Sequence, residues 1–236
     1  MRSAVKAFSL AQQRCRASTS RGRPPTKLFA VKSESYSSTM SKHTPVPRAA
    51  VSIVVRHHNS NKETVPSYLL IERGNPPNAG VWCVPGGKIE MGEKTLEAAK
   101  RELEEEVKFV DDMNEIELGW YTGAFCTSDS IVQGDPETGK TGYHYLIAQC
   151  FAEVLVDSQR SSTQKEPPRV KPADDAQAAR WWTLEEIKKA EAKKETVPNL
   201  AIVIERAESL YQVGMLPTTH TMNIPTTAST TQVDKK

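Results

Sequence analysis

The middle of the chain shows two patterns of apolar and polar residues. Short runs rich in β-branched and aromatic residues, bounded by turn residues, predict strands. These runs cover residues 49–55, 68–71, 116–126, 143–156 and 180–182. Apolar residues that recur at spacings of three and four predict helices over 95–108 and after Pro198. The capping-box sequence Thr183-Leu-Glu-Glu186 predicts another helix that runs to the region of Lys194.

Two segments lack such a pattern. Residues 158–172 have no apolar periodicity and predict a disordered, flexible surface insertion. Residues 217–236 are rich in threonine and predict a disordered tail. We therefore expect the packed domain to lie within residues 47–213.

The start of the chain differs in composition from the rest. Residues 1–33 contain eight Lys or Arg residues and no Asp or Glu, with a short amphipathic face. This composition is typical of an organelle transit peptide. The Arg-bearing start favours a mitochondrial location, while a plastid or cytoplasmic location stays open. A disordered basic leader over 1–40 is the alternative to a transit peptide.

Composition and charge exclude several classes of protein. The chain has 236 residues and no apolar run near the roughly 18 residues that a membrane helix needs, so we expect no membrane partner. Eight of the 31 Lys and Arg residues lie in residues 1–33, so the rest of the chain contains 23 basic and all 29 acidic residues. This acidic remainder argues against general nucleic-acid binding. The four cysteines form no CxxC pair, which argues against a zinc site or a disulfide framework.

The predicted helix over 95–108 carries candidate chemistry. At about 100° per residue, Glu102, Glu105 and Glu106 fall within one arc beside an apolar stripe. The glycine-rich loop before the helix lets Glu93 fold back toward the same point. Clustered carboxylates repel each other, and Mg²⁺ or Mn²⁺ removes this penalty because both ions prefer oxygen ligands. A solvated acidic helix face is the alternative for such a run of charge.

The spacing of these residues resembles the signature of the Nudix hydrolases. Gly87 is followed after five residues by Glu93, after seven more by Arg101-Glu102-Leu103, and after one more by Glu105-Glu106. This Nudix box covers residues 87–109. The resemblance implies an α/β fold, namely a Nudix-type α/β/α sandwich with a mixed β-sheet.

The resemblance also implies roles for the residues of the box. Glu102, Glu105, Glu106 and Glu93 resemble metal ligands, and Glu102, Glu105 and Arg101 resemble catalytic residues. Arg101 would orient the carboxylates through charge-assisted hydrogen bonds. The final glycine of the signature is replaced by Lys108. If Lys108 adopts the left-handed turn that glycine favours there, it costs about 1 kcal/mol.

Residues outside the signature have weaker support as substrate-binding residues. Gly86 and Gly87 permit a close approach of the backbone to phosphates. Arg73 is a candidate phosphate contact, with a solvated arginine as the alternative. His144 is a second candidate contact, with a structural strand histidine as the alternative. Asp174 or its neighbour Asp175 is a candidate for a further acid outside the box.

The resemblance to the MutT-like and ADP-ribose pyrophosphatase-like group implies hydrolysis of a pyrophosphate linkage in a nucleotide-type small molecule. ADP-ribose, a nucleotide, a dinucleotide and a 5′-triphosphate RNA end stay open as substrates, and so does a homodimer. The alternative is a Nudix-fold binding or scaffold protein of weak catalytic activity, which acts in an organelle RNA or nucleotide-binding complex.

Overall fold

The structure is a computed structural model that describes residues 46–58, 65–76, 78–110, 116–134, 141–155, 166–218 and 220–224. The chain divides into two units, residues 1–44 and 45–236, and all described residues lie in the second unit. The predicted leader therefore lies outside the described residues. No helix in these described ranges is long and apolar enough to cross a membrane.

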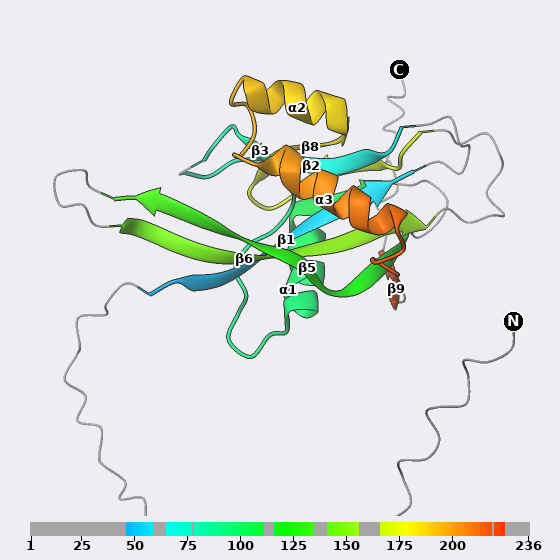
Figure 1. Cartoon of the computed structure of the whole chain (residues 1–236), viewed down its shortest axis with the longest axis horizontal. Coiled ribbons are helices and arrows are strands. Elements are labelled where there is room, and N and C mark those ends of the chain that lie inside the picture. The colour runs from blue at the N-terminus through cyan, green and yellow to red at the C-terminus, as the bar shows by residue number, and fades with distance from the viewer. Residues whose placement is uncertain are drawn as a thin grey trace, which may run out of the picture. The chain divides into compact units, whose positions relative to one another are not determined.

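A seven-stranded sheet forms the centre of the domain (Figure 1). Its strands are β1 (Arg48–His57), β2 (Ser67–Arg73), β3 (Trp82–Cys83), β5 (Ile116–Gln133), β6 (Thr141–Leu155), β8 (Ala176–Thr183) and β9 (His220–Ile224). The order is β3-β2-β1-β6-β5-β9, and β8 pairs with β2. β1 and β6 are parallel, and the other pairs are antiparallel, so the sheet is mixed.

Helices cover both faces of this sheet. In Figure 1, α1 (Thr95–Glu106) lies below the sheet, while α2 (Leu184–Ala192) and α3 (Leu200–Gln212) lie above it. The side chains of β1 alternate between the two layers. Val51, Ile53 and Val55 pack with α1, and Val54 packs with α2 and α3. The structure thus confirms the predicted α/β/α sandwich with a mixed sheet.

A second, two-stranded sheet follows α1 directly. β4 (Val107–Val110) pairs antiparallel with β7 (Arg169–Pro172). The predicted helix over 95–108 therefore ends two residues early, at Glu106. The prediction of a disordered insertion over 158–172 is wrong for its last four residues, because the β4 backbone supplies their pairing and Val170 packs against the core. Residues 158–165 lie outside the described residues.

The C-terminal prediction also needs correction. β9 falls within the segment 217–236 that we expected to be disordered, and it pairs with Ile116–Trp120 of β5. The predicted cap of α2 is confirmed, since the Thr183 hydroxyl accepts from the Glu186 backbone N–H and the Glu186 carboxylate accepts from the Thr183 N–H. Gly214, with φ of 73°, follows the end of α3 in the left-handed region that favours glycine.

Candidate active site

The glycine-rich loop before α1 is held against β1. The backbone N–H of Val51 donates to the Gly87 carbonyl over 2.9 Å, and that of Ile53 donates to the Pro85 carbonyl over 2.8 Å. A Cβ atom on Gly86 would lie 2.3 Å from the Val51 carbonyl oxygen, and the φ of Gly86 is 153°. The loop thus needs glycine at Gly86 to run this close to the strand.

Gly87 makes room for a carboxylate in the same way. A Cβ atom at this position would lie 2.4 Å from Oε2 of Glu102. The Glu102 side chain reaches this place from α1 and is only 13% exposed. The absence of a side chain at Gly87 therefore leaves a cradle that the Glu102 carboxylate fills.

Arg101 lies at the centre of the acidic cluster. Its Nε and Nη2 donate to the two carboxylate oxygens of Glu93 over 2.9 and 3.0 Å. Its Nη1 donates to both Glu102 and Glu105 over 2.9 Å each. Nη2 also donates to the Lys88 carbonyl over 3.0 Å, which connects the loop to the helix. One guanidinium group thus orients three carboxylates and the loop through charge-assisted hydrogen bonds.

Glu106 is the buried member of the cluster. It is 4% exposed, and its carboxylate accepts the backbone N–H of Gly86 over 2.8 Å. Burial, opposed by the hydrogen bond from the Gly86 N–H and aided by the negative charges of Asp175 and Glu102, raises the pKa of Glu106 to about 8. This carboxylate is therefore ionised at neutral pH only at a cost, unless a cation lies nearby.

The neighbouring carboxylates differ in their electrostatics. Burial raises the pKa of Glu102, against the lowering effect of Arg101. Hydrogen bonds from Arg101 and the Glu90 backbone N–H lower the pKa of Glu93. Glu93 is therefore stabilised in its ionised form, whereas Glu102 and Glu106 favour binding of a proton or a metal cation.

The donor set fits a hard divalent cation. Glu93, Glu102, Glu105 and Glu106 supply only oxygen ligands, the chemistry that Mg²⁺ and Mn²⁺ prefer. Among the described residues, no group of three or more His, Cys, Asp or Glu side chains is already gathered closely enough to hold a metal ion. Arg101 instead holds three of the carboxylates, as its hydrogen bonds show.

Two candidates outside the box lie at the same end of the sheet. Arg73 lowers the pKa of Glu106 by its charge, and its own Nε is buried without a hydrogen-bond partner. Asp174 is exposed with φ of 45°, whereas Asp175 is the acid whose charge reaches Glu106. Asn75 donates to Asp175 over 3.1 Å. Of the two aspartates that the sequence left open, the structure turns Asp175 toward the box.

His144 takes a different place. Its Nε2 lies 2.7 Å from Oδ1 of Asp129, across the β5–β6 hairpin. This contact with Asp129 on the hairpin accounts for the histidine without a substrate. Asp129 and Asn75 belong to no motif, so neither contact was predictable from the sequence.

Lys108 does not adopt the turn that its place in the signature suggested. It lies in β4 opposite Lys171, and it is absent from the positive-φ residues of the described chain. Its ammonium group donates to the Glu104 carbonyl at the end of α1. The expected cost of about 1 kcal/mol for a left-handed lysine therefore does not arise, because the chain passes from helix to strand without that turn.

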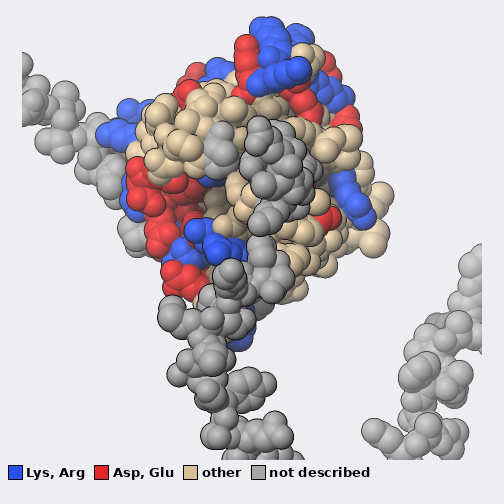
Figure 2. Space-filling model, turned by 90° about the vertical axis from the view of Figure 1, so that its left-hand side faces the viewer, with Lys and Arg blue, Asp and Glu red and all other residues tan. Residues whose placement is uncertain are grey.

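Charged side chains are unevenly spread around this domain. Figure 2 shows acidic side chains gathered in one patch, with basic side chains along its lower border. The acidic side chains in this patch repel one another, and a bound cation would reduce this repulsion.

Comparison with known proteins agrees with this geometry. The sequence model of the NUDIX domain matches residues 46–200 of the chain. The chain belongs to the Nudix hydrolase family. A Caenorhabditis elegans protein named "Putative nudix hydrolase 1" is 32% identical over 102 residues, which cover 41% of this chain and 26% of that protein. The Haloferax volcanii low-salt glycan biosynthesis protein Agl8 is 33% identical over 130 residues, which cover 52% of this Nudix chain and 73% of Agl8.

Solved Nudix structures resemble this fold at low sequence identity. A C. elegans Ap4A hydrolase in a binary complex aligns with a TM-score of 0.46 and 18% identity, over 71% of this chain and 98% of that chain. The NUDIX domain of Shewanella oneidensis NrtR, complexed with ADP ribose, aligns with a TM-score of 0.46 and 15% identity, over 71% and 90% of the respective chains.

Proposed function

We propose that this Nudix protein hydrolyses a pyrophosphate linkage in a nucleotide-type substrate with the help of Mg²⁺ or Mn²⁺. The observation that carries the proposal is the acidic cluster of Glu93, Glu102, Glu105 and Glu106, gathered around Arg101 beside a glycine loop. The pKa values of Glu102 and Glu106 are raised, so their ionised forms are unfavourable, and a bound cation would stabilise these forms.

Glu102, Glu105 and Glu106 would hold the cation, and Glu93 would support it. A bound divalent cation supplies charge stabilisation at phosphoryl oxygens and lowers the pKa of a water molecule. Glu105 is the most accessible of the paired carboxylates, with 46% of its side chain exposed, and it shares its arginine donor with Glu102. Glu105 would therefore be the ligand most open to a cation that arrives from solvent, while Arg101 also holds Glu93 and Glu102.

The protein's own groups would orient the substrate. Gly86 and Gly87 would act through the shape of the loop, because the Val51 carbonyl and the Glu102 carboxylate occupy the spaces beside them. Arg73 carries a positive charge and an unpartnered Nε near Glu106, and would attract a phosphate. Asp175, which accepts a hydrogen bond from Asn75, would supply a carboxylate that acts as a general base and takes a proton from the attacking water.

The substrate class is part of the proposal. We infer a nucleoside diphosphate linked to a further group, such as ADP-ribose or a dinucleotide, or a nucleotide itself. The ADP ribose and Ap4A in the names of the similar structures belong to those proteins, and both compounds are suitable members of a test panel.

A hydrolysis screen tests this function. The purified chain is incubated with ADP-ribose, nucleoside triphosphates, dinucleoside polyphosphates and a triphosphorylated RNA, each with Mg²⁺, with Mn²⁺ and with a chelator. We expect at least one nucleotide to be cleaved at a P–O–P bond only when metal is present. Metal-independent cleavage would contradict the role of the metal, and no cleavage of any member would contradict the proposal and favour the scaffold alternative.

A further inference from the structure

A tight turn over residues 173–176 carries Asp175 to the end of α1. The backbone N–H of Ala176 donates to the Ala173 carbonyl over 3.1 Å and closes the turn. The Ala173 N–H donates to the Glu106 carbonyl over 2.9 Å. Glu106 is the last residue of α1, where backbone carbonyls have no partner within the helix. The turn is therefore attached to the same helix that carries the acidic cluster.

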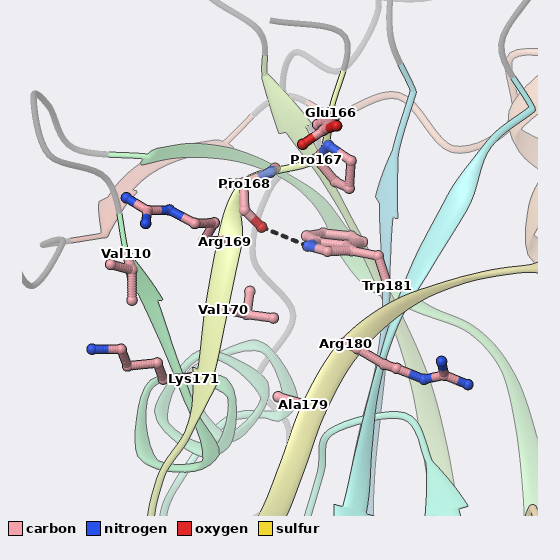
Figure 3. Close-up of a pocket in the computed structure, with 10 residues that line it drawn as sticks. All are labelled: Val110, Glu166, Pro167, Pro168, Arg169, Val170, Lys171, Ala179, Arg180 and Trp181. Atoms are coloured by element: carbon pink, nitrogen blue, oxygen red, sulfur yellow. Dashed lines mark hydrogen bonds between the residues drawn. The ribbon is translucent and has the colours of Figure 1, made fainter. Parts of the chain in front are cut away.

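The strands on either side of this turn have fixed places. β7 pairs with β4, which follows α1 directly, and β8 pairs with β2. The indole N–H of Trp181 on β8 also donates to the Pro168 carbonyl, just before β7, over 2.7 Å, beside the cavity that Figure 3 shows. Asp175 thus lies between two strands that are connected to α1 and to β2.

The chain after β2 holds the turn from the other side. The Gly74 backbone N–H donates to the Asp175 carbonyl over 2.8 Å. A Cβ atom on Gly74 would lie 2.4 Å from that carbonyl oxygen, so this close approach needs glycine. The next residue, Asn75, donates from Nδ2 to Oδ2 of Asp175 over 3.1 Å. The end of β2 therefore fixes both the backbone of Asp175 and the orientation of its carboxylate, whose other oxygen is Oδ1.

Asp175 lies near the buried end of the acidic cluster. Burial, aided by the negative charges of Glu106 and Asp175 and opposed by Arg73, raises the pKa of the Cys83 thiol to about 12. The charges of Asp175 and Arg73 also act on Glu106. These three charged side chains therefore lie close together, so a phosphate at Arg73 and a water molecule near Glu106 would both lie near Asp175.

We propose that Asn75 is a positioning residue, which orients the Asp175 carboxylate for proton transfer from the attacking water. This inference rests on the proposed function, in which Asp175 is the general base. Asn75 holds Oδ2, and Oδ1 takes a proton from the water as the water oxygen bonds to phosphorus. The bridging P–O bond breaks and its electron pair leaves with the other phosphate, and Asp175 then returns the proton to solvent. Asn75 itself touches neither the water nor the substrate.

A double-mutant cycle tests this role. The wild type, Asn75→Ala, Asp175→Asn and the double variant are compared in kcat, KM and thermal midpoint, with the best substrate of the hydrolysis screen. We expect kcat to fall about a hundredfold in Asp175→Asn and about tenfold in Asn75→Ala, with little change in KM or in the midpoint. Asn75→Ala should cause no further loss in the Asp175→Asn variant, because Asn75 acts only through Asp175. Asn78→Ala, which shortens the same kind of side chain further along this loop, should keep the wild-type kcat.

The free protein provides a second readout. The side-chain amide signal of Asn75 in ¹⁵N NMR, assigned by its loss in Asn75→Ala, should shift in Asp175→Asn without any substrate. An unmoved signal would overturn the inference. So would a wild-type kcat in Asn75→Ala, or a loss that is equally large in the Asp175→Asn background, which a merely structural role would give.

Failure of this inference is distinguishable from failure of the proposed function. Hydrolysis that is lost in Asp175→Asn but kept in Asn75→Ala would overturn the role of Asn75 and leave the proposed function standing. A wild type that cleaves no nucleotide would contradict the proposed function and, with it, this inference. Wild-type turnover in Asp175→Asn would exclude Asp175 as the base and overturn the role of Asn75 as well.

Discussion

Gly87 shows how one backbone position controls the acidic cluster. Glu102 occupies the space that a side chain at position 87 would need, and Arg101 then connects Glu102 to Glu93 and Glu105. The sequence predicts the composition of this cluster, because the box spacing is visible in the chain. It does not predict the role of Asp175, because that residue meets Glu106 only through the fold.

Gly87→Ala tests this control. The added methyl group would displace the Glu102 carboxylate, which lies 2.4 Å from the Cβ position, and we expect hydrolysis to fall at least tenfold. The thermal midpoint should change little, because the displaced group is the end of a flexible side chain. Gly123→Ala is the matched control, since a Cβ atom there meets nothing within 4 Å. Equal hydrolytic activity of the two variants would show that the space at Gly87 is not needed to position the Glu102 carboxylate.

His57 makes the stability depend on pH. Burial, together with the charges of His58 and Arg56, lowers the pKa of His57 to about 4. In the unfolded chain its pKa is near 6.5, so between these values the unfolded state binds more protons than the folded state. We therefore expect the free energy of unfolding to fall as pH drops from about 6.5 to 4. The measurement is denaturant unfolding across this range, with His57→Gln expected to show a shallower dependence; equal slopes would exclude His57 as the cause.

Element pairing explains what the sequence pattern missed. β7 reads Arg-Val-Lys-Pro, and its single inward apolar side chain, Val170, is too short a signal to identify a strand. β9 lies in a Thr-rich segment and gains its structure from the edge of β5. The long apolar strands and α1 were predictable because each has many buried positions. Short edge strands depend on a neighbour that lies far away in sequence.

A buried ion pair connects the sheet to α3. The Arg56 side chain is 5% exposed, and its Nε donates to Glu208 over 2.8 Å. The Tyr68 hydroxyl also donates to Glu208 over 2.8 Å, and the Arg56 guanidinium lies 4.1 Å from the centre of the Tyr211 ring. Removing one partner of such a pair leaves the charge of the other partner buried and unpaired.

Glu208→Ala should therefore destabilise the fold by about 3–5 kcal/mol. Glu205→Ala on the same helix is the control, because Glu205 pairs with Lys188 at the surface and should cost less than about 1 kcal/mol. The measurement is the free energy of unfolding in urea. Similar losses in both variants would show that the Arg56 pair contributes no more than a surface pair.

At the scale of the whole molecule, the Nudix domain and the basic leader have separate roles in our account. The family match begins at residue 46, after the leader. From the eight basic residues and the absence of acidic residues in 1–33, we propose that this segment directs import into an organelle.

A reporter fusion tests the leader. Residues 1–40 fused to a fluorescent protein should direct it to mitochondria, and replacing the leader's arginines with glutamine should leave the fusion in the cytosol. The chain that begins at Ser41 should keep its thermal midpoint. A diffuse signal from the unmodified fusion would contradict targeting, and a shorter chain that does not fold would show that the leader stabilises the domain.

If the carboxylates around Arg101 bind a catalytic metal, Glu105→Gln should weaken both metal binding and turnover. This change keeps the shape of the side chain and removes one charge. The measurements are hydrolysis of the best substrate and thermal midpoints with and without Mg²⁺, with Glu104→Gln as a control on the same helix. We expect a loss of turnover of at least a hundredfold, a smaller Mg²⁺-induced rise in the midpoint and an equal or higher midpoint without metal. Glu105→Gln with wild-type turnover and an unaltered Mg²⁺ response would contradict it.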